Sequence, residues 1–293
     1  LCSNIHSVTI PESVKSIGYR AFHDCDGLES LTFNGESIEY NAFDGCTSLK
    51  TLSLGENIKT IGDNAFNGCT ALNNIVMPST VKAIYNYVFE NCTSLSNITL
   101  NEGCTTLGNH VFKNCPLAAV TFPKTLGSIG EYAFESTNLK TVDLFNTKIT
   151  SLPEGCFYDC EQLSDVKLPI ALTDIGECAF YKSVIASITF PSSLQKIDAW
   201  AFQFTQLTNV VIPTKTGHIG DGAFRDNAKL KTVVVNGLEC YLAVSAFAKC
   251  PALTDVYITS DKEPNAGRYG FPFENDPKVH VVPNYLETFK ELK

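Results

Sequence analysis

The stretch Ile61–Leu72, IGDNAFNGCTAL, recurs with small changes along almost the whole chain. Its phenylalanine returns at spacings of 21 to 23 residues, and alanine precedes it in eight of the eleven repeats. A fixed period of this length is the signature of a solenoid, in which each repeat is one small unit packed on the next. The recurring residues are Phe22, Phe43, Phe66, Phe89, Phe112, Phe134, Phe157, Phe180, Phe202, Phe224 and Phe247.

A chain of 293 residues is longer than one compact core usually grows, whereas a repeat array has no such limit. We therefore expect one elongated domain. The formal net charge of −9 disfavours a protein that follows a nucleic-acid backbone and a polybasic membrane anchor. No apolar run approaches the roughly 18 residues that a membrane span needs, so we expect no membrane insertion. Cys2 lies in register with the repeats and no leader-like segment precedes it, which favours a mature or trimmed chain.

Each repeat begins with an alternating segment, as in Leu72–Leu95. Alternation predicts a strand in which Ile75 and Met77 point inward and Val76 points outward. Pro78 then closes the strand, because proline cannot donate a hydrogen bond to the ladder. The remaining residues leave room for tight turns and for no long helix. Stacking the repeats would bury leucine, isoleucine, valine and phenylalanine in continuous columns.

Seven of the twelve cysteines lie three residues after a repeat phenylalanine. Other repeats place threonine, serine or asparagine there, which favours a buried column of small side chains bonded to the turn backbone. A metal site would need ligands at short spacings such as C-x₂-C, and none occurs. Parallel side chains in one column also lack the crossed geometry of a disulfide, so we expect free thiols. The seven are Cys25, Cys46, Cys69, Cys92, Cys115, Cys160 and Cys250.

The unit L-x-x-I-x-I-P-x-x-V-x-x-I-G-x-x-A-F-x-x-C resembles the leucine-rich repeat of the BspA-like group, also called the Treponema pallidum type. It is seen as LNNIVMP at Leu72–Pro78, VKSIGYRAFHDC at Val14–Cys25 and IGEYAFEST at Ile129–Thr137. The resemblance implies a leucine-rich-repeat solenoid, a right-handed β-solenoid or horseshoe with short parallel strands, turns and little helix. It also implies a secreted or surface-exposed protein of bacteria or parasitic protists that acts in adhesion.

The resemblance covers residues 1–259, an array of eleven to twelve repeats, and residues 260–293 resemble the loop, strand and cap that close the group's arrays. Thr259–Pro277 has a loop composition. Val279–Val282 predicts a last strand, in which His280 falls where an inward aliphatic residue is expected. Pro283–Lys293 predicts a short amphipathic capping helix.

No catalytic constellation stands out in the sequence. The five histidines are scattered over distant repeats, and no metalloprotease, hydrolase or P-loop signature occurs. The glycines of Gly217–Gly222 belong to one repeat's turn. We therefore expect a protein that is not an enzyme and that needs no cofactor or metal.

The outward positions of the strands form the candidate binding face. They are mostly small and polar, and two interpretations stay open: a solvated face, or a surface that binds a partner. The candidate residues are Thr141, Asp143, Asp165, Lys167, Thr189, Asn209, Val211, Thr232, Val234 and Tyr257. The face lacks the aromatic platform of many sugar binders. Tyr87, Tyr132 and Trp200 share the position two residues before the phenylalanine, where they either form a second stripe or shield the turn.

The sequence thus favours a non-enzymatic, extracellular or cell-surface protein that binds a protein ligand through its sheet face. The ligand that we expect is a host matrix or surface protein, and the chain is expected to be a monomer. A structural spacer or stalk that presents other domains is the first alternative. A carbohydrate-binding module is the second.

Overall fold

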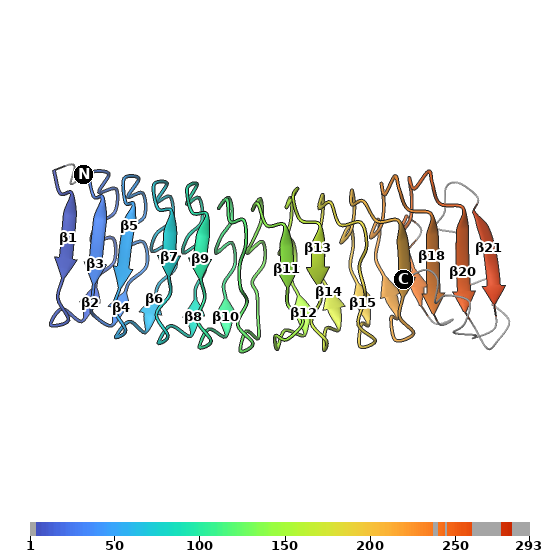
Figure 1. The fold of residues 1–293 in the computed structure, drawn as a ribbon, viewed down its shortest axis with the longest axis horizontal. Coiled ribbons are helices and arrows are strands. Elements are labelled where there is room, and N and C mark those ends of the chain that lie inside the picture. Colours follow the sequence, from blue (N-terminus) through green and yellow to red (C-terminus); the bar gives the residue numbers. More distant parts are fainter. Residues whose placement is uncertain (1–3, 237–239, 244, 260–276, 283–293) are drawn as a thin grey trace.

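The computed structural model describes residues 4–236, 240–243, 245–259 and 277–282. Figure 1 shows a chain that winds in stacked turns along one long axis, with strands of successive turns side by side. All strand pairs are parallel, and the described residues contain no helix. The prediction of a parallel β-solenoid is therefore confirmed.

The first row of strands holds the alternating segments of the repeats. Its strands are β1 (Ser7–Ile10), β3 (Ser30–Phe33), β5 (Thr51–Leu54), β7 (Asn74–Val76), β9 (Asn97–Thr99), β11 (Thr141–Asp143), β13 (Asp165–Lys167), β16 (Asn209–Ile212), β18 (Thr232–Asn236), β20 (Asp255–Thr259) and β21 (Lys278–Val282). Equivalent residues of neighbouring repeats pair directly, as Ser7 does with Ser30. Ala119 makes a single bridge to Asn97, and no strand forms around Thr189.

The second row consists of two-residue strands that follow the turn after the proline positions. These are β2 (Ser16–Ile17), β4 (Ser37–Ile38), β6 (Thr60–Ile61), β8 (Ala83–Ile84), β10 (Thr106–Leu107), β12 (Ser151–Leu152), β14 (Asp174–Ile175), β15 (Lys196–Ile197), β17 (His218–Ile219) and β19 (Tyr241–Leu242). The second residue of each strand is buried, so this row closes another side of the core.

The repeat phenylalanines form one column along the core. Neighbouring ring centroids lie between 5.0 and 5.8 Å apart, within the range of favourable aromatic contacts. Ten of the eleven rings are almost completely buried, and Phe22, next to the N-terminal end, is half-buried. The predicted phenylalanine column is confirmed.

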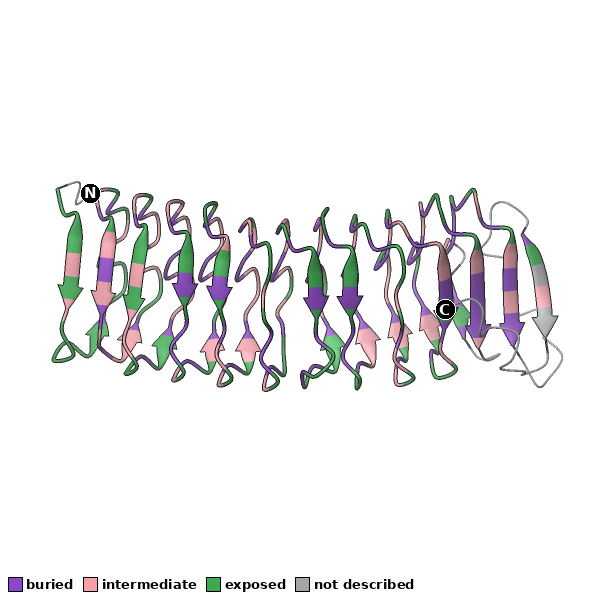
Figure 2. Ribbon diagram, viewed as in Figure 1, coloured by how far each residue is buried: buried purple, intermediate pink, exposed green. Residues whose placement is uncertain are grey.

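The strands alternate between buried and exposed residues, which Figure 2 shows as bands of colour. In β7 the inward Ile75 is buried and the outward Val76 is 60% exposed, as the pattern predicts. Met77 is buried directly before Pro78. The alternation therefore separates core from surface correctly in this repeat.

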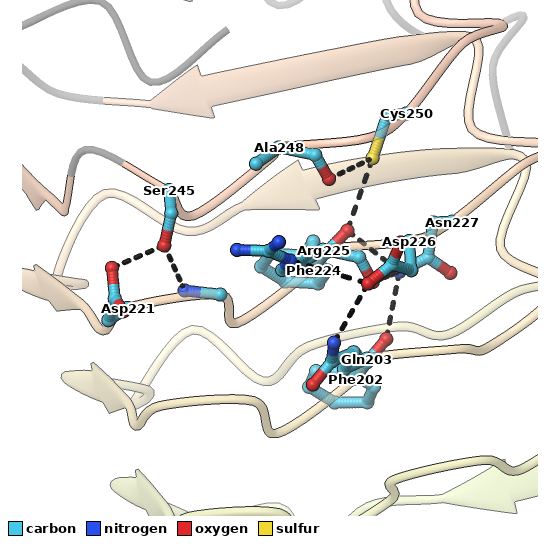
Figure 3. Close-up of polar contacts among 11 residues, drawn as sticks. Phe202, Gln203, Asp221, Phe224, Arg225, Asp226, Asn227, Ser245, Ala248 and Cys250 are labelled. Carbon is cyan, nitrogen blue, oxygen red and sulfur yellow. Dashed lines mark hydrogen bonds and ion pairs between the residues drawn. The ribbon is translucent and has the colours of Figure 1, made fainter. Parts of the chain in front are cut away.

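The cysteine column bonds one turn to the turn before it. Cys46 Sγ donates to the carbonyl oxygen of Phe22 at 3.0 Å, and Cys115 Sγ donates to that of Phe89 at 3.0 Å. Asn227 occupies the same column and donates to the carbonyls of Phe202 and Phe224, both at 2.8 Å (Figure 3). The side chain in this column thus adds a bond between neighbouring turns; the carbonyls of Phe22 and Phe89 also accept a backbone N–H within their own turn.

All eleven described cysteines are free, and all except the half-buried Cys178 are buried. Burial raises the pKa of Cys46 to about 12, because a thiolate would be poorly solvated there. The predictions of free thiols and of a hydrogen-bonded column are confirmed for these residues. Cys2 lies outside the described residues.

The backbone takes a left-handed conformation two residues before and two residues after every repeat phenylalanine from Phe22 to Phe224, and also two residues after Phe247. Glycine holds only four of these positions, Gly45, Gly68, Gly155 and Gly222, and seventeen carry a side chain. Aromatic residues are among them, as at Tyr132 with φ of 53°. Each such residue costs free energy that the stacked turns must offset.

At the C-terminal end, β21 confirms the predicted last strand, one residue longer than expected. The inward placement of His280 is wrong. His280 pairs in register with the outward Tyr257, and their rings stack at 4.6 Å. His280 Nε2 also lies 3.0 Å from Asp255 Oδ1, so the ring belongs to the outer row. The predicted loop falls mostly, and the capping helix wholly, outside the described residues, and the boundary at residue 259 stays a prediction.

Candidate binding surfaces

The outer face of the first strand row is small, polar and uncharged over its N-terminal half. Its rungs there carry serine, threonine and asparagine, with Val76 and Ala119 as the apolar exceptions. Ser30 Oγ donates to Ser7 Oγ at 2.8 Å, so neighbouring hydroxyls bond along the row. This half offers neutral hydrogen-bonding groups to a partner, and its outward strand positions carry no charged side chain.

The first charged group on this face lies on β11 and β13. Thr141 pairs in register with Asp165, and Asp143 with Lys167. Lys167 Nζ lies 3.0 Å from Asp143 Oδ2, and this hydrogen bond lowers the pKa of Asp143. All four side chains are exposed, so the structure brings these predicted candidates together on one surface.

The C-terminal candidates lie on β16, β18 and β20. Asn209 pairs with Thr232, and Val211 pairs with Val234, which in turn pairs with Tyr257. The exposure predicted for Val234 is wrong, because the residue is only 1% exposed between Val211 and the larger Tyr257. Val211 is 38% exposed and Tyr257 is half-buried. Thr189 is exposed as predicted, although no strand holds it.

A second surface lies over the turns that contain the phenylalanine column, and we call it the Phe-turn edge. Figure 3 shows part of it, where polar side chains bond between neighbouring turns. Gln203 Nε2 donates to Asp226 Oδ2 at 2.9 Å, and Asp226 also pairs with Arg225 Nε at 3.4 Å. Ser245 donates to Asp221 and accepts from the backbone of Gly222. The Gln203–Asp226 and Asp221–Ser245 bonds join neighbouring turns in this part of the edge.

Aromatic side chains cross the Phe-turn edge in one unbroken diagonal, which we call the aromatic stripe. Successive ring centroids along it are 4.9, 5.2, 6.1, 4.8 and 5.5 Å apart. Its members are Tyr87, His110, Tyr132, Tyr158, Tyr181 and Phe204. The ring of Tyr132 lies over Gly155, where an added Cβ would sit 2.2 Å from it, so the missing side chain makes room for the stripe to change columns.

Repeat position alone predicts only the first part of this stripe. Tyr87 and Tyr132 share their repeat position with Trp200, whereas the stripe passes from that position to the residues after the phenylalanine. Trp200 instead lies over Gly222, where a Cβ would come within 2.4 Å of the indole. A search for aromatic residues at adjacent positions of neighbouring turns would have found the other members.

A row of carboxylates runs beside the aromatic stripe, at the position three residues before the phenylalanine. Glu131, Glu154 and Glu177 hold this position in three successive repeats. Tyr132 Oη donates to Glu154 Oε1 at 2.5 Å, which joins the row to the stripe. Burial raises the pKa of Glu177, and the nearby carboxylates of Glu154 and Asp198 raise it further. Three carboxylates at one position of successive turns place several acidic groups along this row, and the effect of Glu154 on the pKa of Glu177 shows that they lie near each other.

The second strand row carries a shallow, open hollow, lined in part by Asp174, Lys196 and His218. It contains no nucleophile bonded to a base. Among residues 4–236, 240–243, 245–259 and 277–282, no group of three potential metal ligands comes together. In the same residues no helix is long and apolar enough to cross a membrane.

Comparison with known families decides the class of the protein. The profile of the BspA type leucine rich repeat region matches in overlapping segments, residues 1–116, 34–140, 82–203 and 150–271. The chain belongs to the BspA-type leucine-rich repeat family. Such repeat proteins are generally not enzymes, and their fold commonly serves protein–protein interaction. A comparison with curated proteins gives no match.

Solved structures share the fold of this BspA-type array. A leucine-rich repeat protein from Bacteroides ovatus is 22% identical with a TM-score of 0.59, over 96% of this chain and 85% of that one. The pneumococcal vaccine antigen PcpA is 19% identical with a TM-score of 0.57, over 96% and 90%. A Treponema pallidum leucine-rich repeat protein is 24% identical over 61% and 76%, with a TM-score of 0.48. At these identities the similarity concerns the fold alone.

Proposed function

We propose that this BspA-type array is an extracellular or cell-surface adhesin that binds a protein of a host or of another cell. The binding surface is the outer face of the first strand row, from β11 to β20. The observation that carries the proposal is the in-register pairing of β11 with β13, of β16 with β18 and of β18 with β20, which aligns outward side chains of neighbouring turns. A preorganised surface of this kind loses little conformational entropy when a partner docks.

The composition of the face favours a protein ligand over a sugar. Its C-terminal half combines the Asp143–Lys167 ion pair with the partly exposed Val211 and Tyr257, a mixture typical of protein interfaces. Aromatic rings that could stack on a sugar are missing from the described part of the face, except for Tyr257 and His280, which stack on each other. A carbohydrate module is therefore the weaker alternative.

The test is a binding screen with the array immobilised against matrix proteins, plasma proteins and a glycan panel. The face variant is T189E/V211E, because both residues are exposed there. The matched control is I170E/T214E, which places the same charges on the exposed turns that follow β13 and β16. Saturable binding to a protein that only the face variant loses would support the proposal.

Other outcomes favour the alternatives. A folded array that binds nothing in the screen would favour a spacer that presents neighbouring domains. Binding to glycans alone would favour the carbohydrate module. Binding that the face variant and its control lose equally would place the contact elsewhere on the molecule.

A further inference from the structure

The aromatic stripe on the Phe-turn edge is not a requirement of the fold. The positions that it uses carry other residues in other repeats: Asn41 and Asn64 two residues before the phenylalanine, Asn67 one residue after it, and Asn91 and Asn114 two residues after it. Asparagine also tolerates the left-handed backbone better than a ring does. Six contacting aromatic side chains therefore need an explanation other than turn geometry.

The stripe is accessible from solvent. Phe204 is 42% exposed, and Tyr87, Tyr132, Tyr158 and Tyr181 are all partly exposed. Aromatic side chains are enriched in the centres of protein interfaces, because they bury a large area at a small cost in side-chain entropy. An exposed row of them on a repeat protein indicates a surface that a partner covers.

The charge beside the stripe defines the chemistry of that partner. Among the described residues, no lysine or arginine forms an ion pair with Glu131, Glu154 or Glu177. By contrast, Lys113 and Lys182 are already paired, with Glu135 at 3.0 Å and with Asp159 at 3.2 Å. Apart from the hydrogen bond that Glu154 Oε1 accepts from Tyr132, the carboxylate row is therefore available to a cation from outside the chain.

The chain itself shows that a cation fits against the stripe. Lys182 Nζ lies 5.9 Å from the centre of the Tyr181 ring, at the distance of a cation–π contact. Arginine would do the same more effectively, since its planar guanidinium both stacks on rings and pairs with a carboxylate in two hydrogen bonds.

From the aromatic stripe and the carboxylate row together, we propose that the Phe-turn edge is a second binding surface, which takes an arginine- and lysine-rich segment of a protein partner. Basic side chains would pair with Glu131, Glu154 and Glu177, and their stems and guanidinium planes would cover Tyr132, Tyr158 and Tyr181. This surface is separate from the sheet face, so either surface can bind without the other.

The experiment measures binding of two fluorescent peptides to the whole chain by anisotropy. One peptide alternates arginine and glycine, and its control alternates glutamate and glycine. The first variant, E131Q/E154Q/E177Q, removes the charge of the row. The second, Y158N/Y181N/F204N, replaces three rings with the residue that other repeats use at these positions. The matched control, E12Q/E56Q/E102Q, removes three exposed carboxylates from the turns after the first strand row.

The arginine peptide is expected to bind saturably, and both variants are expected to raise its Kd by about tenfold or more, since each removes several partly exposed contacts. The E12Q/E56Q/E102Q control is expected to keep the original Kd. Thermal melts check that the variants fold, and the glutamine variant keeps the proposal testable if the asparagine variant unfolds.

Three results would overturn the proposal. The first is arginine-peptide binding no tighter than that of the glutamate peptide. The second is an equal loss in the control, which would indicate general attraction to a chain of net charge −9. The third is an unchanged Kd in E131Q/E154Q/E177Q. The sheet-face variant T189E/V211E should leave this Kd unaltered, which keeps the two surfaces experimentally distinct.

Discussion

The phenylalanine column predicts a dependence of stability on position that an ordinary globular core would not show. Phe134 is fully buried and contacts three rings: Phe112 and Phe157 at 5.4 Å each, and Phe122 edge-on at 5.6 Å. Phe22 is half-buried and contacts only Phe43 among the described rings, at 5.0 Å. The same substitution should therefore cost much more in the middle of the array than at its end.

Truncating a buried phenylalanine to alanine costs about 3–5 kcal/mol, and the three ring contacts place Phe134→Ala near the upper limit. For Phe22→Ala we expect about 1–2 kcal/mol, because about half of the transfer free energy and one ring contact are lost. Phe134→Leu keeps most of the volume and loses the ring contacts, so its cost should be about 1–2 kcal/mol.

Urea unfolding followed by circular dichroism measures these differences. Hydrogen exchange then shows whether the turns on either side of residue 134 lose protection together, as nearest-neighbour coupling in a repeat array requires. A cost below about 1 kcal/mol for Phe134→Ala would refute the reasoning, since no buried ring is removed that cheaply. Equal costs at positions 134 and 22 would also refute it.

Three further outcomes are expected. In the folded chain burial raises the pKa of Cys46 to about 12 and that of Cys160 to about 11, whereas an unfolded thiol titrates near 8.5. The unfolded chain therefore loses these protons first, so each thiol lowers the free energy of unfolding by about 1.4 kcal/mol per pH unit between about pH 8.5 and its folded pKa. C46T/C160T should reduce this slope in urea titrations at alkaline pH, and an unchanged slope would contradict the expectation. Ser183 is fully buried and its hydroxyl has no hydrogen-bond partner among the described residues, so Ser183→Cys should raise the free energy of unfolding by about 1 kcal/mol, and a loss of stability would show that the site needs its oxygen. Val234→Asp should destabilise the array by more than about 3 kcal/mol, whereas Val211→Asp should cost less than about 1 kcal/mol, because residue 234 is buried and residue 211 is partly exposed. Similar costs in thermal melts would indicate that residue 234 is exposed after all.

The period of the sequence was sufficient to predict the core. Phenylalanine, cysteine and the alternating aliphatic residues recur at fixed offsets, and stacked turns convert a fixed offset into a column. The same logic explains the failure at His280, because the segment around it departs from the repeat pattern and offers no fixed offset from which to read the register. Only the pairing with Tyr257 places the ring on the outer row.

The exposure of a strand side chain was harder to predict than the face of the sheet to which it points. Alternation assigns Val234 to the outer row correctly, and burial there depends on Val211 and Tyr257 in the neighbouring turns. The left-handed backbone of the turns could not be predicted from the sequence, for a different reason. Glycine, the usual signal of positive φ, occupies only four of the positions, and residues such as Tyr132 and Trp200 hold others.

The direction of the hydrogen bonds has a mechanical consequence. Strand pairs join successive turns, so the bonds lie along the long axis and a pull on the two ends loads them one turn after another. Each turn adds about 4.8 Å to the folded rod. Its 21 to 23 residues span about 70–75 Å when extended, so a released turn becomes about fifteen times as long as it was in the rod. An optical trap should record sawtooth extensions of this size. A single rupture of the whole array would show that the turns fail together. Under flow or traction, an array of this kind would dissipate mechanical work one turn at a time while its remaining turns stay folded.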